Sequence, residues 1–390
     1  MQLLFIGYRS GAHEAATRRG AKAKWILDAT TRVPRGMSSD DYVLADLRAD
    51  GAKLMKIARR LYPRKRPDHV IALTERAVVA AARLRELYAM AGLSVEVAQD
   101  CHDKVLMKQA LEGASIAVAD FEPVEADTRA EELVKTLGLP MVLKQRDSSG
   151  SRGTIIARTL EQVRENLVEG WMAESFIDGI ELSVESFVKG GEPIFTNLTE
   201  YLAPGWANIM PARHVDAHRE EILELNRRVI AALGVERGVT HLELFITATD
   251  LVVGELAARP PGGHLMNLLS DTYGFDAWEA FLSVECGEQP RVSSTVEAIH
   301  GVYLLHPGEG VLSGVEGIAE ARKIEGITKV HCPLRRGVHI GARDGVGQSV
   351  GHISASGATR QHVVDALMQA HAMITFHLKS AAIPLGEGSA

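Results

Sequence analysis

Cysteine is scarce in this sequence, and the few cysteines are far apart. They are Cys101, Cys286 and Cys332. An odd number of widely spaced cysteines argues against a disulfide framework and against a zinc site built from paired cysteines. Because thiols stay reduced inside the cell, this usage favours a cytoplasmic protein.

Long apolar runs are also missing. No segment approaches the roughly 18 consecutive apolar residues that a membrane-spanning helix needs. The chain opens with the mostly apolar residues 1–6, but Gly7 ends this run, and Arg9 and His13 follow soon after. The run is too short for the apolar region of a signal peptide and predicts a strand instead. We therefore expect no association with a membrane.

An excess of positive charge is the third missing feature. The chain carries 43 basic and 50 acidic residues, which gives a formal net charge of -7, and it has no long basic run. Proteins that bind nucleic acid neutralise its phosphates with clustered lysine and arginine side chains. The charge pattern therefore excludes nucleic acid as an expected partner.

The composition that remains is typical of a folded protein. Hydrophobic residues make up 46% and charged residues 24% of the 390 positions. These values lie close to the average for globular domains. At the usual domain size, the length allows two or three packed units.

Residues 1–100 alternate apolar strands with helical patterns, which is typical of a parallel α/β domain. Strands are predicted at residues 3–7 and 70–73. Thr74 is the expected N-cap of a helix that ends at Gly92, because a short hydroxyl side chain caps helices well and glycine stops them.

The next helix has a clear start and stop. Asp103 is its expected N-cap, and Gly113 is its stop signal. The apolar residues inside it recur at helical spacing and should face inward. These residues are Leu106, Met107, Ala110 and Leu111.

The rest of the chain predicts α+β structure. Its central part should contain strands at residues 139–145, 171–177, 181–188, 241–247 and 251–256. From about residue 295, short strands rich in Val, Gly and His precede a helix capped by Thr359. The last residues, 380–390, are expected to be a frayed tail.

The loop 147–153 has the sequence Asp-Ser-Ser-Gly-Ser-Arg-Gly. Its glycines would let backbone amides face a phosphate without a side-chain clash. It is not a Walker loop, because Lys144 precedes the loop instead of following its last glycine. A surface hairpin has the same composition, so the loop alone leaves both interpretations open.

Two glutamates interrupt strands that are otherwise apolar. Glu243 lies in His-Leu-Glu-Leu-Phe, and Glu255 lies in Val-Val-Gly-Glu-Leu. A buried carboxylate is costly unless it is paired or bound to a cation, so this pair indicates a shared hard ion such as magnesium. The alternative is that each glutamate pairs with an arginine, and Arg259 is the obvious candidate.

Taken in order, these motifs resemble those of the ATP-grasp superfamily over nearly the whole chain. The matching motifs are Asp103-Lys104 at a helix start, residues 139–144, residues 148–153, residues 174–181 with a glutamate at each end, and Glu243 with Glu255 and Arg259. In addition, the run Glu-Leu-Ala-Ala-Arg at 255–259 is similar to the L-amino-acid ligase branch.

The resemblance implies three parts. Residues 1–100 look like the parallel α/β domain that precedes the ATP-grasp domain. Residues 101–294 look like the two-lobed ATP-grasp domain itself, with a lid subdomain at about 120–200. Residues 295–390 look like the small C-terminal α+β domain of the biotin-carboxylase-like branch.

The resemblance also implies ATP between the two lobes. Lys104 and Lys144 would neutralise its phosphates, and Lys144 would also take part in catalysis. The loop would close over the phosphates through Ser149, Gly150 and Ser151.

The adenine and the ribose would lie at residues 174–181. Glu174 would meet the adenine together with backbone groups near Ser175 and Ile177. Glu181 would bind the ribose hydroxyls.

A metal ion and a catalytic arginine complete the implied site. Glu243 and Glu255 would hold Mg²⁺, or Mn²⁺ in its place, bridging the phosphates. Arg259 would stabilise charge on the transferred phosphoryl group and on an acyl phosphate. Many family members carry asparagine two residues after the second glutamate, where this chain has Ala257. The resemblance therefore leaves open whether one or two metal ions bind.

The acceptor substrate would lie near residues 260–264, where Gly262 and Gly263 allow close approach to the backbone. An ordinary turn is the alternative there. Arg213 and His214 lie where the family often shapes its substrate site, with solvated loop residues as the alternative.

The function expected from this resemblance is an ATP-dependent carboxylate-amine ligase that forms an amide through an acyl phosphate and releases ADP and phosphate. One alternative is a biotin-carboxylase-like subunit that forms carboxyphosphate from bicarbonate. A non-catalytic ATP-binding module is another. The expected partners are small-molecule carboxylate and amine substrates, with a homodimer as one option for assembly.

Overall fold

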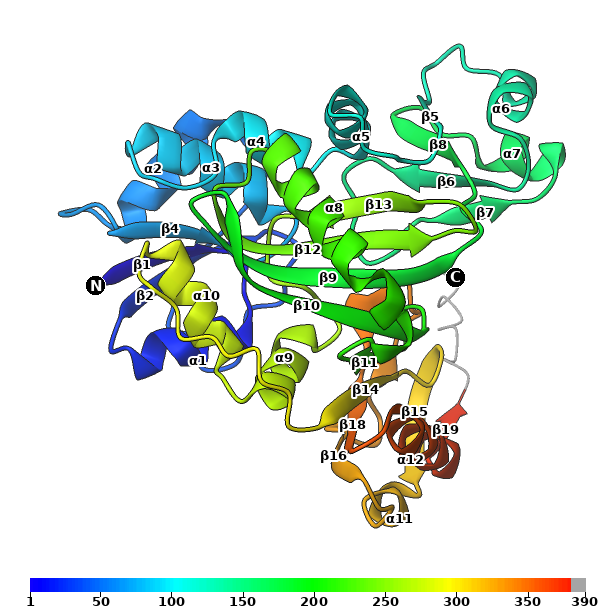
Figure 1. The fold of residues 1–390 in the computed structure, drawn as a ribbon. Helices are drawn as coiled ribbons and strands as arrows, with labels where there is room; N and C mark the ends of the chain where they lie inside the picture. The colour runs from blue at the N-terminus through cyan, green and yellow to red at the C-terminus, as the bar shows by residue number, and fades with distance from the viewer. Residues whose placement is uncertain (380–390) are drawn as a thin grey trace, which may run out of the picture.

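The computed structural model describes residues 1–379 and opens with a parallel sheet in the order β3-β2-β1-β4 (Figure 1). Its strands are β1 Gln2–Ile6, β2 Lys22–Asp28, β3 Tyr42–Ala45 and β4 His69–Ala72. The helices of this region are α1 Ser10–Arg18, α2 Gly51–Leu61, α3 Ala77–Leu87 and α4 Val95–Asp100. The strand order reverses between β1 and β4, because β2 and β3 extend the sheet on the other side of β1.

The predicted cap at Thr74 is wrong. Helix α3 begins at Ala77 without a side-chain cap and ends at Leu87, before the expected stop at Gly92. The side chain of Thr74 packs instead against Gly7, where an added Cβ would lie 2.6 Å from Thr74 Oγ1. Contact between the loops that follow β1 and β4 therefore replaces the expected cap.

The cap at Asp103 is confirmed. Helix α5 spans Lys104–Gly113, and the Asp103 carboxylate accepts hydrogen bonds from the N–H groups of Val105 at 2.9 Å and Leu106 at 3.3 Å. Leu106 does not face inward as expected, since it is 37% exposed, while Met107 is buried.

A four-stranded antiparallel sheet follows, in the order β5-β8-β6-β7. Its strands are β5 Phe121–Pro123, β6 Met141–Gln145, β7 Ile155–Ala157 and β8 Trp171–Ser175. Helices α6 Ala130–Leu137 and α7 Leu160–Asn166 share a separate apolar core with this sheet.

The largest sheet has eight antiparallel strands in the order β13-β12-β9-β10-β11-β14-β18-β16. They are β9 Ile180–Lys189, β10 Glu192–Ala203, β11 Ala207–Met210, β12 Arg237–Ile246, β13 Leu251–Ala257, β14 Ile299–Leu305, β16 Ile327–His331 and β18 Gly351–Gly357. The sheet continues across residue 295, and β9 and β10 pair within it and not with the four-stranded sheet. The domain boundaries expected from the sequence remain a proposal.

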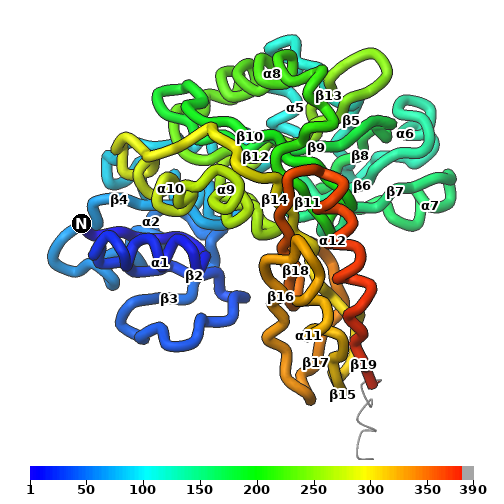
Figure 2. The backbone as a smooth tube through the Cα atoms, turned by 60° about the horizontal axis from the view of Figure 1, so that its bottom comes forward, coloured from blue at the N-terminus to red at the C-terminus, as the bar shows by residue number. Residues whose placement is uncertain are grey.

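The remaining elements cover this sheet and extend the C-terminal end. Figure 2 shows the C-terminal strands and α12 as a lobe that projects beside the N-terminal sheet. The remaining helices are α8 Arg219–Ala232, α9 Leu265–Tyr273, α10 Ala277–Glu285, α11 Ile318–Ala321 and α12 Arg360–Met373, with 3₁₀ turns at Arg213–His218 and Val346–Gln348. A three-stranded sheet contains β17 His339–Ile340, β15 Gly310–Glu316 and β19 Thr375–Lys379. The expected tail, 380–390, lies outside the described residues.

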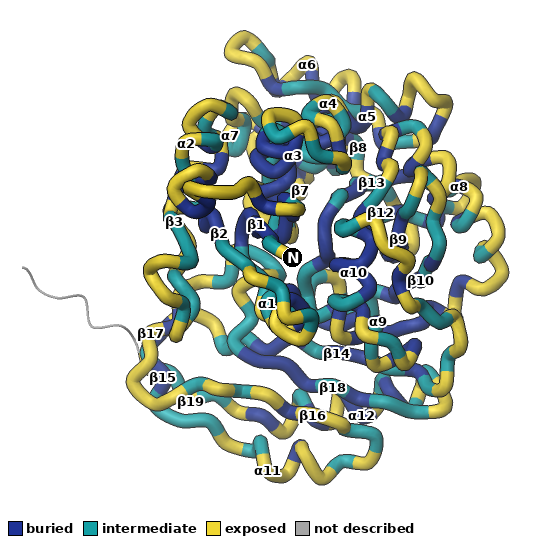
Figure 3. The backbone as a smooth tube through the Cα atoms, turned by 90° about the vertical axis from the view of Figure 1, so that its left-hand side faces the viewer, coloured by how far each residue is buried: buried dark blue, intermediate teal, exposed yellow. Residues whose placement is uncertain are grey.

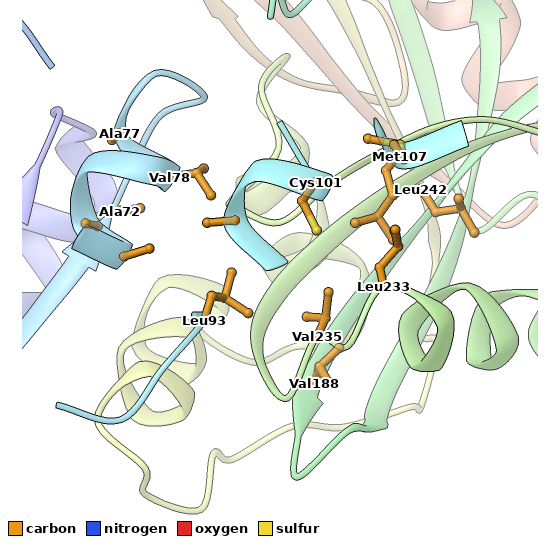
Figure 4. Close-up of a cluster of buried hydrophobic side chains, with 14 of the residues drawn as sticks. Ala72, Ala77, Val78, Leu93, Cys101, Met107, Val188, Leu233, Val235 and Leu242 are labelled. Atoms are coloured by element: carbon orange, nitrogen blue, oxygen red, sulfur yellow. The ribbon is translucent and has the colours of Figure 1, made fainter. Parts of the chain in front are cut away.

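One apolar core joins the N-terminal helices to the eight-stranded sheet. Figure 4 shows Ala77 and Val78 of α3 on one side and Val188 and Leu242 of β9 and β12 on the other, with Met107 of α5 alongside Leu242. Figure 3 colours most of β1 and long stretches of β14 and β18 as buried. The shared core fixes the loops after β1 and β4 against the central region. Among the helices of residues 1–379, none combines the length and the apolar character that spanning a bilayer requires.

Candidate functional site

Two carboxylates lie side by side on neighbouring strands of the candidate site. Glu243 on β12 and Glu255 on β13 are register partners in the antiparallel pair, next to a β-bulge that shifts the register after Glu243. The residues before and after them, such as Leu242 and Leu256, are buried. The alternation of the strands therefore places two acidic side chains on one face, above an apolar core.

Glu243 is held by two neighbours. Tyr201 donates its hydroxyl to Glu243 Oε1 at 3.2 Å, and His241 Nε2 lies 3.4 Å from the same oxygen. Burial would raise the pKa of Glu243, but the hydrogen bond and charge of His241 outweigh it and lower that pKa. Glu243 is therefore an ionised carboxylate at neutral pH.

Behind Glu243 lies a buried polar network that the sequence interpretation missed. Glu185 on β9 is fully buried and accepts hydrogen bonds from Ser183 Oγ at 2.7 Å and Thr199 Oγ1 at 2.5 Å. The Nδ1 atom of His241 lies 2.9 Å from Glu185. The imidazole thus bridges two carboxylates, and together these bonds raise the pKa of His241 to about 9 even though burial opposes the shift.

Lys104 connects Glu255 with the glycine-rich loop. Its Nζ lies 3.2 Å from Glu255 Oε1 and donates to the carbonyl oxygen of Ser148 at 2.6 Å. The side chain is 5% exposed, so this ammonium is nearly closed off from water. The alternative partner for Glu255, Arg259, is wrong, because the nearest carboxylate to Arg259 is Glu75 at 2.8 Å.

Two further lysines share one carboxylate. Lys144 Nζ lies 2.5 Å from Glu174 Oε1, and Lys108 Nζ lies 3.1 Å from Glu174 Oε2. The second contact is an ion pair whose geometry departs from that of a hydrogen bond. Lys108 was not predicted as a site residue. Its place four residues after Lys104, on the same helical face, was the signal in the sequence.

The two lysines have opposite pKa shifts. Burial favours the neutral forms, but Glu174 and Glu255 overcome it at Lys144 and raise its pKa. At Lys108 burial prevails over Glu174, so its pKa is lowered. At Glu174 the two lysines outweigh burial and lower the pKa. Glu174 therefore carries a negative charge between two cations.

Glu181 has the opposite environment. Burial is the larger cause and the charge of Glu243 the smaller one, and together they raise the pKa of Glu181 to about 7. Glu181 begins β9, while Ser175 ends β8 and donates its N–H to the Asp120 carbonyl at 2.9 Å. Ile177 lies in the link between these strands. The residues predicted to meet adenine and ribose are thus gathered where the two sheets join.

The glycine-rich loop contacts both the N-terminal and the C-terminal regions of the protein. Asp147 pairs with Arg48 of the N-terminal region at 2.6 Å, and the Gly150 carbonyl accepts a hydrogen bond from the N–H of Val346 at 3.2 Å. Gly150 has a φ of +66° and Ser151 one of +59°, so the loop turns through the left-handed region that glycine favours.

Val346 lies among three glycines. A Cβ added to Gly150, Gly205 or Gly263 would lie 3.8 Å, 3.7 Å or 3.4 Å from its side chain. These glycines belong to the loop 147–153, to the β10–β11 turn and to the predicted acceptor turn. Val346 therefore joins the glycine-rich loop to the turn at residues 260–264. An added Cβ at Gly262 would meet no atom within 4 Å, so that position is open.

Arg213 and His214 lie outside this cluster of contacts. The Arg213 side chain is 54% exposed and approaches Asp216 at 3.7 Å. His214 Nδ1 lies 3.1 Å from Glu200, which also binds Arg360. Their predicted substrate role remains a prediction.

Ala257 stands where many ATP-grasp proteins carry asparagine, and its surroundings are well defined in the structure. Ala257 is buried at the end of β13 and is the register partner of His241. The imidazole that holds Glu243 thus lies across the strand from the position where many family members carry asparagine.

Comparisons with family models gave two matches. Residues 302–379 match the model of L-amino acid ligase C-terminal domain 2, and residues 109–268 match the ATP-grasp domain model. The first match lies within the expected C-terminal part, 295–390, and the second lies within the expected ATP-grasp part, 101–294.

Relatives with curated descriptions agree with these models. The L-arginine-specific L-amino acid ligase of Bacillus subtilis is 27% identical over 290 residues, which cover 69% of this chain and 70% of the relative. A D-alanine–D-alanine ligase of Desulfotalea psychrophila is 30% identical over 176 residues, which cover 39% of this chain and 52% of that enzyme.

Solved structures share the fold over almost the whole length. The L-amino acid ligase from Bacillus licheniformis superposes with a TM-score of 0.82 at 20% identity, covering 97% of this chain and 99% of the other. The N5-carboxyaminoimidazole ribonucleotide synthetase from Thermotoga maritima gives a TM-score of 0.76 at 20% identity, with 97% and 99% covered. The predicted combination of α/β and α+β parts is confirmed.

Proposed function

Because the chain belongs to the ATP-grasp superfamily and, within it, to the L-amino acid ligase family, we propose that it joins the carboxylate of one amino acid to the amine of another. A carboxylate oxygen attacks the terminal phosphoryl group of ATP, and ADP leaves. The amine then attacks the acyl carbon, phosphate leaves, and the nitrogen loses a proton as the amide forms.

The observation that carries this proposal is the contact chain from Glu243 and Glu255 through Lys104 to the Ser148 carbonyl. It brings paired carboxylates, an ammonium and the glycine-rich loop to one place. Phosphoryl transfer depends on positioned charges around the transferred group far more than on covalent chemistry by the protein.

The lysines supply the positive charge. Lys104 and Lys144 would neutralise the phosphates, and Lys108 adds a further positive charge beside Glu174. Because these ammonium groups are buried, their attraction for phosphate is screened less than it would be at the surface. Arg259 would stabilise charge on the transferred phosphoryl group.

Glu243 and Glu255 fit a hard divalent cation. Carboxylate oxygens are the donors that Mg²⁺ and Mn²⁺ prefer, and an ion there would offset the negative charge that helps raise the pKa of Glu181 to about 7. Within residues 1–379, no three His, Cys, Asp or Glu side chains gather into a complete metal site. Further ligands would therefore be phosphate oxygens or water. When bound, the ion would screen the charge of the phosphate oxygens.

Hydroxylamine provides the test, because it is a small nucleophile that needs no specific pocket. Wild-type protein with ATP, Mg²⁺ and one amino acid at a time should yield an amino-acid hydroxamate and an equal amount of ADP for at least one amino acid. The Lys144→Ala variant should yield neither, which controls for contaminating activity.

Other outcomes distinguish the alternatives. ADP release that requires bicarbonate, with no hydroxamate from any amino acid, would indicate the carboxylase. ATP binding without turnover would indicate a non-catalytic module. AMP as the nucleotide product with a productive amino acid would exclude the acyl phosphate.

A further inference from the structure

The loops after β1 and β4 meet where the strand order of the N-terminal sheet reverses. Open parallel sheets bind ligands at such a reversal, in the crevice outside the carboxyl ends of the strands. Arg9 follows β1 here, and Glu75 follows β4. Neither residue was predicted as part of the site.

The short segment 73–75 binds both Arg9 and Arg259. Arg9 donates from Nε to the carbonyl oxygen of Leu73 at 3.2 Å. Two residues further on, the Glu75 carboxylate accepts from Arg259 Nε at 2.8 Å and lies 2.9 Å from His102 Nδ1. The segment 73–75 therefore brings the Arg9 side chain to the arginine expected at the reacting phosphoryl group.

Positive charge exceeds negative charge in this cluster. Glu75 is already bound by Arg259 and His102. Across residues 1–379, no aspartate or glutamate carboxylate lies within 4.0 Å of the Arg9 guanidinium. Burial first, and the charge of Arg259 second, lower the pKa of Arg9 to about 10. An anion beside Arg9 would favour its charged form and so offset both of these effects on its pKa.

Contacts link Arg9 to the turn 260–264, where the acceptor is expected. Arg259, which is bound to Glu75 of the segment 73–75, also donates from Nη1 to the carbonyl oxygen of Pro260 at 3.1 Å. The charge of Arg9 contributes, after burial, Lys329 and His331, to the lowered pKa of His264 at the end of the same turn. Since Nε of Arg9 is used by Leu73, its two terminal nitrogens remain for a bidentate partner, the geometry in which arginine binds carboxylates.

We propose that Arg9 binds the free carboxylate of an α-amino acid that serves as the amine substrate. The inference rests on the proposed function and adds to it the residue that binds and orients the acceptor. An amino-acid acceptor keeps its own carboxylate through the reaction. A guanidinium that holds this group directs the acceptor's amine, and not its carboxylate, toward the acyl phosphate.

The test compares three nucleophiles in the Arg9→Gln variant. The first is the amino acid that gives the fastest ADP release as acceptor with the wild type, the second is its carboxamide, and the third is hydroxylamine. For the amino acid, KM should rise at least about tenfold, because charge-assisted hydrogen bonds to the carboxylate are lost. For the carboxamide and hydroxylamine, which lack that carboxylate, KM should stay within about twofold of the wild type.

Two further variants complete the design. Arg18→Gln removes an exposed arginine of α1 that pairs with Asp276 and should behave as the wild type. Arg9→Lys retains the charge without the bidentate geometry, so its KM for the amino acid should lie between those of wild type and Arg9→Gln. It also tests the proposal if Arg9→Gln fails to fold.

Equal losses with all three nucleophiles, or an unchanged KM for the amino acid, would overturn the role of Arg9. If the wild type itself formed no hydroxamate with any amino acid, the proposed function would fail, and the acceptor assignment with it. The two failures are therefore told apart by the wild-type reaction alone.

Discussion

Arg259 donates a hydrogen bond from Nε to Glu75 Oε2 at 2.8 Å, across 184 positions of sequence. The bond ties the residue that follows β13 to the loop after β4, and so joins the central region to the N-terminal sheet. Both side chains are buried, at 9% and 7% exposure. Removing one partner of a buried pair leaves an uncompensated charge, which is why this contact can be measured by mutation.

Glu75→Gln should lower stability in a pH-dependent way. Burial raises the pKa of Glu75, but Arg259 and His102 outweigh it and lower the pKa from 4.5 to about 2. A lowered carboxyl pKa stabilises the fold above pH 4.5, and this contribution falls as pH drops toward 2. Its size is about 3 kcal/mol at pH 7, at about 1.4 kcal/mol for each pKa unit.

Urea unfolding of wild type and Glu75→Gln at pH 7, 5 and 3.5 would measure this effect. The difference in unfolding free energy should shrink at the lowest pH, where the wild-type carboxyl loses part of its advantage. A difference that stays constant over this range would show that the ionised form of Glu75 is not what stabilises the fold.

Lys144→Ala should abolish turnover and weaken ATP binding by about tenfold or more, because solvent cannot replace a phosphate-neutralising charge in a closed site. The fold should survive, since Glu174 retains Lys108 as an ion-pair partner. Calorimetry of ATP binding is the measurement. Lys189→Ala, which removes a surface lysine bonded to Gln289, is the matched control. ATP affinity equal to that of the wild type would remove Lys144 from the site.

Glu255→Gln should abolish magnesium-dependent turnover, because a neutral amide binds a hard cation more weakly than a carboxylate does. Its contact with Lys104 offers a purely structural role instead. In that case ADP release would persist at the wild-type magnesium requirement while the melting temperature fell. Magnesium titrations of ADP release, with thermal melts of both proteins, separate the two roles. Glu297→Gln, at an exposed position, serves as the control.

Val346→Ala should uncouple ATP cleavage from amide formation. The truncated side chain would leave space between Gly150 and Gly263, and water could then reach the acyl phosphate. The ratio of phosphate released to hydroxamate formed should rise about twofold or more, while ATP binding changes little. Val338→Ala, at a residue 40% exposed in the same C-terminal region, controls for the substitution itself. An unchanged ratio would mean that Val346 does not seal the site.

The features that could be predicted from sequence are those that neighbouring residues in the chain already reveal. Glu243 and Glu255 were recognisable because a charge on an apolar strand needs a partner, and the strands indeed pair them. Asp103 was recognisable as a cap because a helix start needs an acceptor. The ATP-grasp resemblance and the ligase branch are confirmed by the matches to the two family models, and the structural match confirms the fold.

What could not be predicted depends on distant segments. The partner of Arg259 was sought at Glu255, close in sequence, but three-dimensional packing brings Glu75 nearer. Thr74 had the chemistry of a cap, and its contact with Gly7 took precedence. Lys108 and His241 gain their importance only from Glu174 and Glu185, which other strands supply. The individual roles assigned to site residues remain predictions.

The continuous eight-stranded sheet has a consequence for protein engineering. A shortened chain that ended before residue 295 would strip β14 from β11 and turn β11 into a sheet edge. All four residues of β11, Ala207 to Met210, are buried in the intact protein. An apolar edge with unpaired backbone groups recruits strands from other molecules. Such a truncated protein should therefore aggregate, and the C-terminal part cannot be removed or exchanged as an independent module unless its replacement restores a strand beside β11.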